Sequence, residues 1–315
     1  MTNLVTIRSG EWPLSGVVHT PRFRPKRRVG VVLLHENFNT KFGTHRIFYQ
    51  LGEALADNGL YALRYDNRGT CDSPRIHPLT FLDRVEDACA ASKFFMNNFE
   101  LDSMLFWGLC MGAAVAVHAS EQLGPQRPRG MMLCSILADP LDASLPQFGY
   151  AQVNLSRFIE QRLFRGGAWQ RAVRFVTDRA YRQNAYRLVK TLLGRYFSSG
   201  PELGQLQSQI ARVGDLLSRY TGPTVFVFGD KDDSLPTFVK RINVDDRLAL
   251  ATRESERTLL LIEGGDHTFS VLKHTQILIS WTTAWAQAMR DGTPPQFDHA
   301  KSEITGGITV AAPAN

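Results

Sequence analysis

The stretch Gly108-Leu109-Cys110-Met111-Gly112 decides the fold that this 315-residue sequence predicts. An apolar run, Met104 to Trp107, precedes it, and a small-residue helical segment follows it. A nucleophile between two glycines, after a strand and before a helix, is typical of a sharp turn that holds a side chain above a sheet. The glycines leave room for the turn, and the helix N-terminus favours a thiolate. We therefore predict that Cys110 is a catalytic nucleophile, the alternative being a buried structural cysteine.

Apolar runs alternate with helical patterns on both sides of this turn. The runs that predict buried strands begin at Val29, Leu60, Met104, Gly130, Pro223 and Thr258. Such alternation is typical of a mostly parallel sheet covered by helices. We expect residues 1–138 and 221–290 to form this α/β core, residues 139–220 to form a helical lid, and residues 291–315 to be a disordered tail.

The partners of such a nucleophile are an acid and then a histidine along the chain. His267 is predicted as the histidine because it follows the last apolar run in a glycine-rich loop. The acid belongs after the preceding strand, where Asp230, Asp232 and Asp233 stand close together. Their spacing favours Asp232; the other two are expected to be solvated loop residues, either of which could substitute for it. Asp139, after an earlier strand, is the alternative acid.

An oxyanion hole needs two N–H donors near the nucleophile. We expect one from Met111, directly after the cysteine, and the other from Asn37 in the loop after residues 29–35. Glu36 is unusual in this loop because a carboxylate repels a developing oxyanion unless it points away or is protonated. Glu36 is therefore predicted to contact the substrate or a water, and Phe38 is assigned to substrate binding.

A cysteine nucleophile changes the chemistry that the site favours. A thiolate is a better nucleophile than a neutral hydroxyl, and His267 can take its proton. The acyl-cysteine formed is a thioester, so onward transfer of the acyl group is easy. Three functions stay open. The first is hydrolysis of an ester or thioester through acyl-Cys110, the second is acyl transfer from CoA or a carrier protein to an acceptor other than water, and the third is a non-catalytic binding module.

Three segments together resemble the α/β-hydrolases called exosortase A system-associated hydrolase 1. They are Gly43-Thr44-His45-Arg46, Leu63 to Ser73, and Trp107-Gly108-Leu109-Cys110. The pattern Asp66-x-Arg68-Gly69-x-x-x-Ser73 within the second is shared by α/β-hydrolases broadly, whereas the other two are more particular. The resemblance covers residues 29–140 and implies an α/β-hydrolase fold with a Cys-His-Asp site. The chain departs from the pattern at Glu36, and Cys71 stands where many α/β-hydrolases have glycine.

Basic and aromatic residues dominate the predicted lid. Between Arg157 and Arg195 the sequence holds nine arginines and Lys190, against Glu160 and Asp178 as the acids. A solvated basic face explains this composition, and the alternative is docking of an acidic carrier protein or an anionic lipid surface. Nucleic acid is not an expected partner, because no recognition motif accompanies the basic residues.

Composition limits the remaining choices. The chain is 43% hydrophobic with a formal net charge of +6. It has no run of 18 apolar residues and no signal-type apolar stretch at its start, which predicts a cytoplasmic protein. The four cysteines lack metal-type spacing, so reduced thiols and no metal are expected. We expect a small-molecule acyl substrate and no cofactor.

Overall fold

The computed structural model describes residues 1–36, 39–74, 79–138, 201–245, 257–297, 300–305 and 308–313. The chain divides into two compact units, Met1–Ala138 with Ala211–Asn315, and Asp139–Ile210. The predicted lid, residues 139–220, therefore lies mostly outside the described residues. Its described end holds α7 (Pro201–Ala211) and α8 (Val213–Arg219), and α8 belongs to the first unit, where it packs against the helix that follows Cys110.

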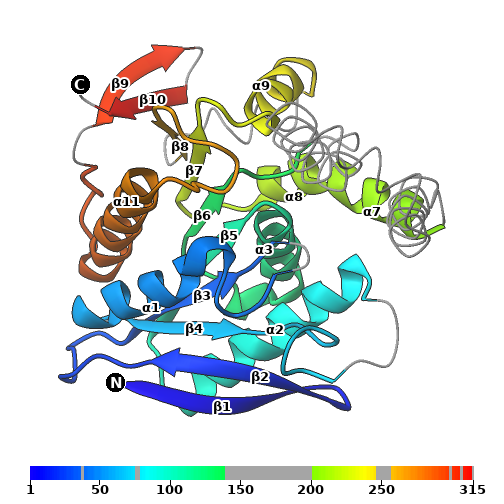
Figure 1. Cartoon of the computed structure of the whole chain (residues 1–315), viewed down its shortest axis with the longest axis vertical. Helices are drawn as coiled ribbons and strands as arrows, with labels where there is room; N and C mark the ends of the chain where they lie inside the picture. Colours follow the sequence, from blue (N-terminus) through cyan, green and yellow to red (C-terminus); the bar gives the residue numbers. More distant parts are fainter. Residues whose placement is uncertain are drawn as a thin grey trace, which may run out of the picture. The chain divides into compact units, whose positions relative to one another are not determined.

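A sheet of ten described strands forms the centre of the first unit, in the order β1-β2-β4-β3-β5-β6-β7-β8-β10-β9 (Figure 1). Adjacent strands from β4 to β10 are parallel, and the pairs β1–β2, β2–β4 and β9–β10 are antiparallel. This confirms the predicted mostly parallel sheet. The strands are β1 (Thr2–Ser9), β2 (Trp12–His19), β3 (Val29–Leu34), β4 (Tyr61–Tyr65), β5 (Ser103–Leu109), β6 (Met131–Cys134), β7 (Thr224–Gly229), β8 (Arg257–Ile262), β9 (Ala300–Thr305) and β10 (Ile308–Pro313).

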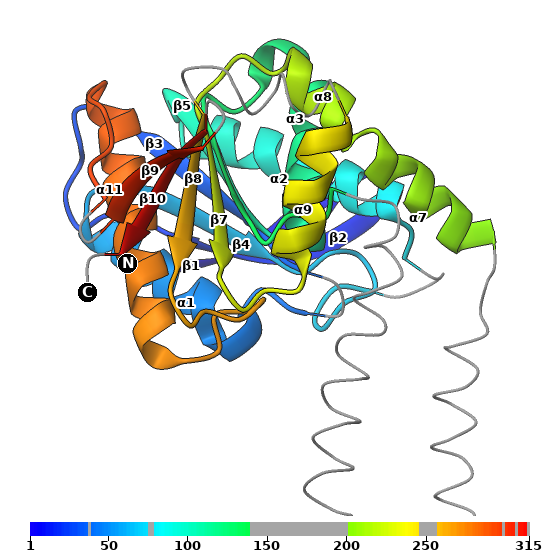
Figure 2. The same ribbon diagram turned by 90° about the horizontal axis from the view of Figure 1, so that it is seen from above.

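Helices cover both faces of this sheet (Figure 2). On one face α1 (Ile47–Asp57) packs with α11 (Leu272–Asp291), and on the other α2 (Phe81–Asn98) packs with α3 (Met111–Gln122). Every residue of β3, β5 and β7 is buried between these layers, which explains their continuous apolar sequences. None of the helices that the structure describes has the length and apolar character that crossing a membrane requires.

The C-terminal segment differs from the disorder that its composition predicted. Helix α11 continues to Asp291, and β9 and β10 extend the sheet, with β10 parallel to β8. The physical reason is local: β-branched side chains favour a pleated strand even where glycine, proline and alanine are frequent nearby. Those residues are Ile304, Thr305, Ile308, Thr309 and Val310.

Candidate active site

Cys110 lies in the turn between β5 and α3, at the carboxyl edge of the sheet. Its backbone has φ 55° and ψ −117°, a conformation that a residue with a Cβ adopts only with strain. Its amide donates to the carbonyl of Cys134 on the neighbouring strand at 2.9 Å, and its side chain is buried. The strand, strained residue and helix therefore follow one another as the sequence predicted.

The glycines on either side of Cys110 are required by space. A Cβ on Gly112 would lie 2.0 Å from the carbonyl oxygen of Leu34, and one on Gly108 would lie 2.6 Å from the Cα of Ala113. The start of α3 thus rests directly on the backbone at the end of β3. Because Leu34 stands opposite Gly108 in the parallel register, the loop after β3 leaves the sheet beside the cysteine.

His267 and Asp232 meet at the same edge of the sheet. The Nδ1 atom of His267 lies 2.8 Å from Oδ1 of Asp232. The same oxygen accepts hydrogen bonds from the amide of Ser234 at 2.9 Å and from its hydroxyl at 2.7 Å. Burial alone would raise the pKa of Asp232, but the hydrogen bond and charge of His267 hold it below its ordinary value. The hydrogen bonds from Ser234 and the contact with His267 hold this carboxylate in place.

The imidazole of His267 also lies beside the Cys110 sulfur. Burial alone would lower the pKa of His267, but the charge of the Cys110 sulfur and the hydrogen bonds with Asp232 and Cys110 raise it well above its ordinary value. The imidazole therefore interacts with both the carboxylate of Asp232 and the sulfur of Cys110. The side chain of His267 is 27% exposed, so solvent reaches this pair.

The loops that carry the acid and the imidazole touch each other through their backbones. A Cβ on Gly229 would lie 2.1 Å from the carbonyl oxygen of Gly265. The amide of Lys231 donates to that oxygen at 2.9 Å, and the amide of Gly264 donates to Asp230 Oδ1 at 2.7 Å. Asp230, predicted as a solvated loop residue, is exposed and also fixes this turn.

Ser135 belongs to the site and was missed by sequence reasoning. It follows β6, has φ 47° and is fully buried. Its hydroxyl donates to the carbonyl of His267 at 3.0 Å and contributes to the low pKa of Asp232. The available signal was its position, because the residue directly after a parallel strand lies at the carboxyl edge, where ligands bind. Asp139, the alternative acid, lies outside the described residues.

The residues predicted for the oxyanion hole and substrate are placed only in part. Met111 is the first residue of α3, where amides have no acceptor within the helix. Asn37 and Phe38 lie outside the described residues. Glu36 is buried, and its Oε1 accepts from the Asn39 amide and the Thr44 hydroxyl within its own loop. Its Oε2 is buried without a hydrogen-bond partner among the described residues.

The other three cysteines are held as neutral thiols. Burial raises the pKa of Cys89 to about 11 and that of Cys134 well above its ordinary value. Burial, together with the charges of Asp66 and Asp72, raises the pKa of Cys71 as well. The Cys110 sulfur lies beside the His267 imidazole.

The sheet order, the turn at Cys110 and the adjoining His267–Asp232 pair define an α/β hydrolase. The family described as serine aminopeptidase, S33 matches residues 31–270, and the chain belongs to that family. The family is typically built around a serine nucleophile, and this chain has a cysteine, Cys110, in the strand-to-helix turn after β5. A search of curated proteins found no match.

Solved hydrolases from several organisms share the fold. Est1E from Butyrivibrio proteoclasticus, solved with ferulic acid bound, is 14% identical with a TM-score of 0.62, covering 92% of this chain and 100% of that one. Proline iminopeptidase from Mycobacterium smegmatis is 14% identical with a TM-score of 0.57, covering 92% and 99%. Dienelactone hydrolase from Anabaena variabilis is 12% identical with a TM-score of 0.55, covering 91% and 97%. At these identities the likeness shows the fold alone.

Proposed function

We propose that this hydrolase cleaves an ester or thioester through an acyl intermediate on Cys110. One observation carries the proposal: Nδ1 of His267 lies 2.8 Å from Oδ1 of Asp232, at the same edge of the sheet as the strained turn that holds Cys110 between β5 and α3. A nucleophile, a base and an acid that orients the base are the three roles that acyl transfer requires. We assign them to Cys110, His267 and Asp232.

The reaction then runs in two balanced halves. Because Nδ1 of His267 is bound to Asp232, its Nε2 is the nitrogen that takes the thiol proton. The sulfur attacks the carbonyl carbon, and the bond to the leaving alcohol or thiol breaks as His267 returns the proton to it. Water then attacks the acyl-cysteine, with His267 taking its proton, and the carboxylic acid leaves as the thiol re-forms.

Negative charge on the carbonyl oxygen needs donors at the turn. We propose the Met111 amide as one donor, since it begins α3 directly after Cys110. The second donor is proposed from the loop after β3, where Asn37 remains the predicted residue. Glu36 stays a proposed contact of substrate or water, and its engaged Oε1 explains how a carboxylate is tolerated there.

Acyl transfer to an acceptor other than water is the second candidate, favoured by the cysteine itself. An acyl-cysteine lies close in energy to a thioester substrate, so a thiol, alcohol or amine competes well with water for it. An acidic carrier protein or anionic lipid surface, docking on the predicted basic lid, remains a proposed partner. The closer likeness to exosortase A system-associated hydrolase 1 and the cytoplasmic location also remain proposals.

The decisive experiment compares wild type with Cys110→Ala on p-nitrophenyl acetate and on acyl-CoA. We expect the variant to lose activity by about 10⁴-fold, because the covalent step is removed. Cys89→Ala is the matched control, since that thiol is half-buried on α2 and is held neutral. Intact-mass spectrometry of wild type during turnover should show one added acyl group, located at Cys110.

The outcomes separate the candidates. Undiminished activity in Cys110→Ala removes the proposed nucleophile. Discharge of the adduct by water alone supports hydrolysis, whereas a stable adduct that only an added acceptor discharges supports transfer. If Cys110 reacts with iodoacetamide no faster than Cys134 across neutral pH, the chain is a binding module on a hydrolase scaffold.

A further inference from the structure

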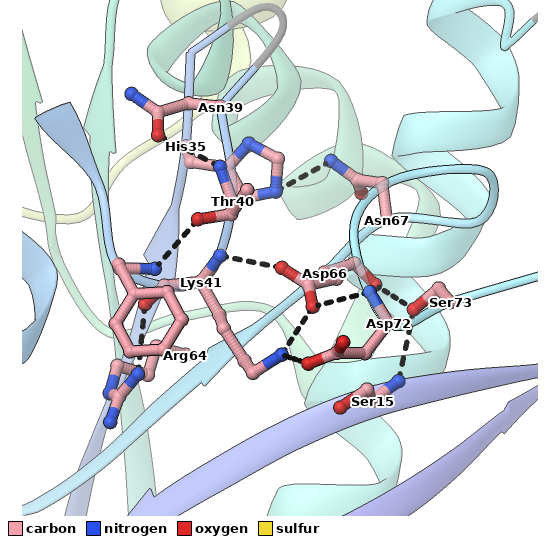
Figure 3. Close-up of polar contacts among 11 residues, drawn as sticks. Ser15, His35, Asn39, Thr40, Lys41, Arg64, Asp66, Asn67, Asp72 and Ser73 are labelled. Atoms are coloured by element: carbon pink, nitrogen blue, oxygen red, sulfur yellow. Dashed lines mark hydrogen bonds and ion pairs between the residues drawn. The ribbon is translucent and has the colours of Figure 1, made fainter.

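Three charged side chains fasten the loop after β3 to the loop after β4. We call the described residues His35, Glu36 and Asn39–Gly43 the oxyanion loop. The ammonium of Lys41 lies 2.5 Å from Oδ2 of Asp66 and 2.5 Å from Oδ2 of Asp72, and the amide of Lys41 donates to Oδ1 of Asp66 at 2.7 Å. Figure 3 shows the lysine side chain reaching between the two carboxylates. Lys41 is thus held by side chain and backbone together.

This clasp of Lys41, Asp66 and Asp72 is largely buried. Lys41 is 4% exposed and Asp66 0%, while the carboxylate of Asp72 opens to solvent. Burial alone would lower the pKa of Lys41, but its bonds to the two carboxylates hold it above its ordinary value. Removing charges from water is costly, and a buried ion pair is weak evidence for stability. The cost of burying these charges indicates a role other than stability.

The carboxylates of Asp66 and Asp72 also lie near the Cys71 sulfur, in a grouping that could hold a metal ion. Asp66, Cys71 and Asp72 place one ligand atom each within 4.8 Å of one another. Lys41 already bonds both carboxylates from this group, so its ammonium neutralises the charge that a cation would otherwise balance. We therefore infer no metal here. The lysine instead links the two carboxylates to the loop after β3.

The other end of the oxyanion loop is also held by residues of β4 and of the turn after β4. The ring of His35 contacts the Asn67 amide at 3.2 Å through Nε2 and the carbonyl of Glu36 at 3.0 Å through Nδ1. The carbonyl of Lys41 accepts from Arg64 on β4 at 3.2 Å. Both described ends of the loop are thereby fixed to β4 and the turn after it, on the far side of the loop from Cys110 and β5.

We propose that Lys41 is a positioning residue for acyl transfer, acting through Asp66 and Asp72 to fix the oxyanion loop beside Cys110. The inference rests on the proposed function, because it concerns the loop assigned to hold the charged carbonyl oxygen. Small displacements of such donors slow acyl transfer steeply, since they act over hydrogen-bond distances. Lys41 itself touches no reacting atom.

Two reactions of Cys110 distinguish a loss of loop positioning from a general disturbance of the active site. Acylation by p-nitrophenyl acetate builds an oxyanion and needs the loop. Alkylation by iodoacetamide displaces iodide at a saturated carbon, so it needs the thiolate and the imidazole but builds no oxyanion. A variant that slows acylation and leaves alkylation unchanged has lost the loop's contribution alone.

The experiment measures both rate constants and the unfolding midpoint for wild type, Lys41→Met, Lys41→Arg and Asp72→Asn. Arg28→Met is the matched control, because it removes a cation paired with Glu100 at 2.7 Å at the opposite edge of the sheet. We expect Lys41→Met to acylate about 10- to 100-fold more slowly with alkylation within about two-fold of wild type. Lys41→Arg should recover part of the rate, and Asp72→Asn should lose less than Lys41→Met.

Each result decides the proposal. Acylation within two-fold of wild type in Lys41→Met overturns it, and so does a parallel fall of acylation and alkylation, which indicates a structural role. If Lys41→Met does not fold, unchanged acylation in both Lys41→Arg and Asp72→Asn overturns it instead. Failure of wild-type Cys110 to acylate is a different result, because it removes the proposed function and this inference with it.

Discussion

Two sets of charged groups, one at each edge of the central sheet, differ in how far they are buried. At the carboxyl edge, Asp232 and Asp66 are almost fully buried, and each is held by several partners. At the amino edge, Arg28 pairs with Glu100, whose side chain is 71% exposed, and Arg290 pairs with its chain neighbour Asp291. Pairs in solvent contribute little, whereas buried charges cost desolvation and are kept where chemistry needs them. The groups proposed for catalysis thus gather at the carboxyl edge, among buried charges.

The largest effect at the carboxyl edge is expected from His267→Ala. The imidazole is the proposed base for Cys110, so kcat/KM on p-nitrophenyl acetate should fall about 10⁴-fold. Alkylation of Cys110 by iodoacetamide should slow as well, because the thiolate loses its partner imidazolium. A variant that retains more than a tenth of wild-type activity would contradict the assignment of His267 as the base.

Asp232→Asn should come next, with kcat/KM lower by about 10³-fold. The amide keeps the shape of the acid but supplies no charge to His267, so the pKa of His267 falls toward its ordinary value. Because His267 returns its proton to the leaving group, the alkaline limb of the kcat/KM profile should move to lower pH. A pH–rate profile for both proteins measures this, and an unmoved limb contradicts the assigned role.

The same raised pKa has a consequence for stability. Since the folded pKa of His267 exceeds its ordinary value of 6.5, its imidazolium stabilises the fold fully below that pH. The contribution is lost as the pH rises through the folded pKa. We expect the unfolding free energy of wild type to fall over this interval more than that of Asp232→Asn, measured by urea titration at several pH values.

Cys110→Ser tests whether the site is built for sulfur. A hydroxyl is not ionised at neutral pH and depends wholly on His267 as base, so we expect kcat to fall on the order of 10²-fold. The family typically uses serine at this turn, which makes the substitution a fair comparison. Activity equal to wild type would show that the carboxyl edge is organised for either nucleophile.

The smallest effect is expected at the amino edge. Arg28→Met removes an exposed ion pair, and kcat/KM should stay within about two-fold of wild type with an unfolding midpoint close to it. Thermal unfolding and the esterase assay measure both. A large loss of activity would show that charged groups at the amino edge also affect catalysis at the carboxyl edge.

Much of the core was predictable because its signals are local. The runs at β3, β5 and β7 are continuous in sequence since both faces of these strands are buried. The turn at Cys110 was predictable because backbone atoms lie so close to Gly108 and Gly112 that neither position has room for a Cβ. The sequence therefore shows glycine at both positions.

What the sequence missed depends on contacts between distant segments or on weak local patterns. Helix α9 (Ser234–Val244) was not predicted, and β9 and β10 were assigned to a disordered tail. Ser135 joins the site only because β6 and β8 bring it to the carbonyl of His267, 132 positions later in the chain. Lys41 looked like a loop residue because its carboxylate partners lie 25 and 31 positions away.

The contact between Gly229 and Gly265 has a mechanical consequence. The turn that bears the carboxylate and the turn that bears the imidazole pack backbone to backbone, with no side chain between them. A side chain at Gly229 would collide with the backbone of Gly265, so any larger residue there would push the two turns apart and pull the acid away from the ring.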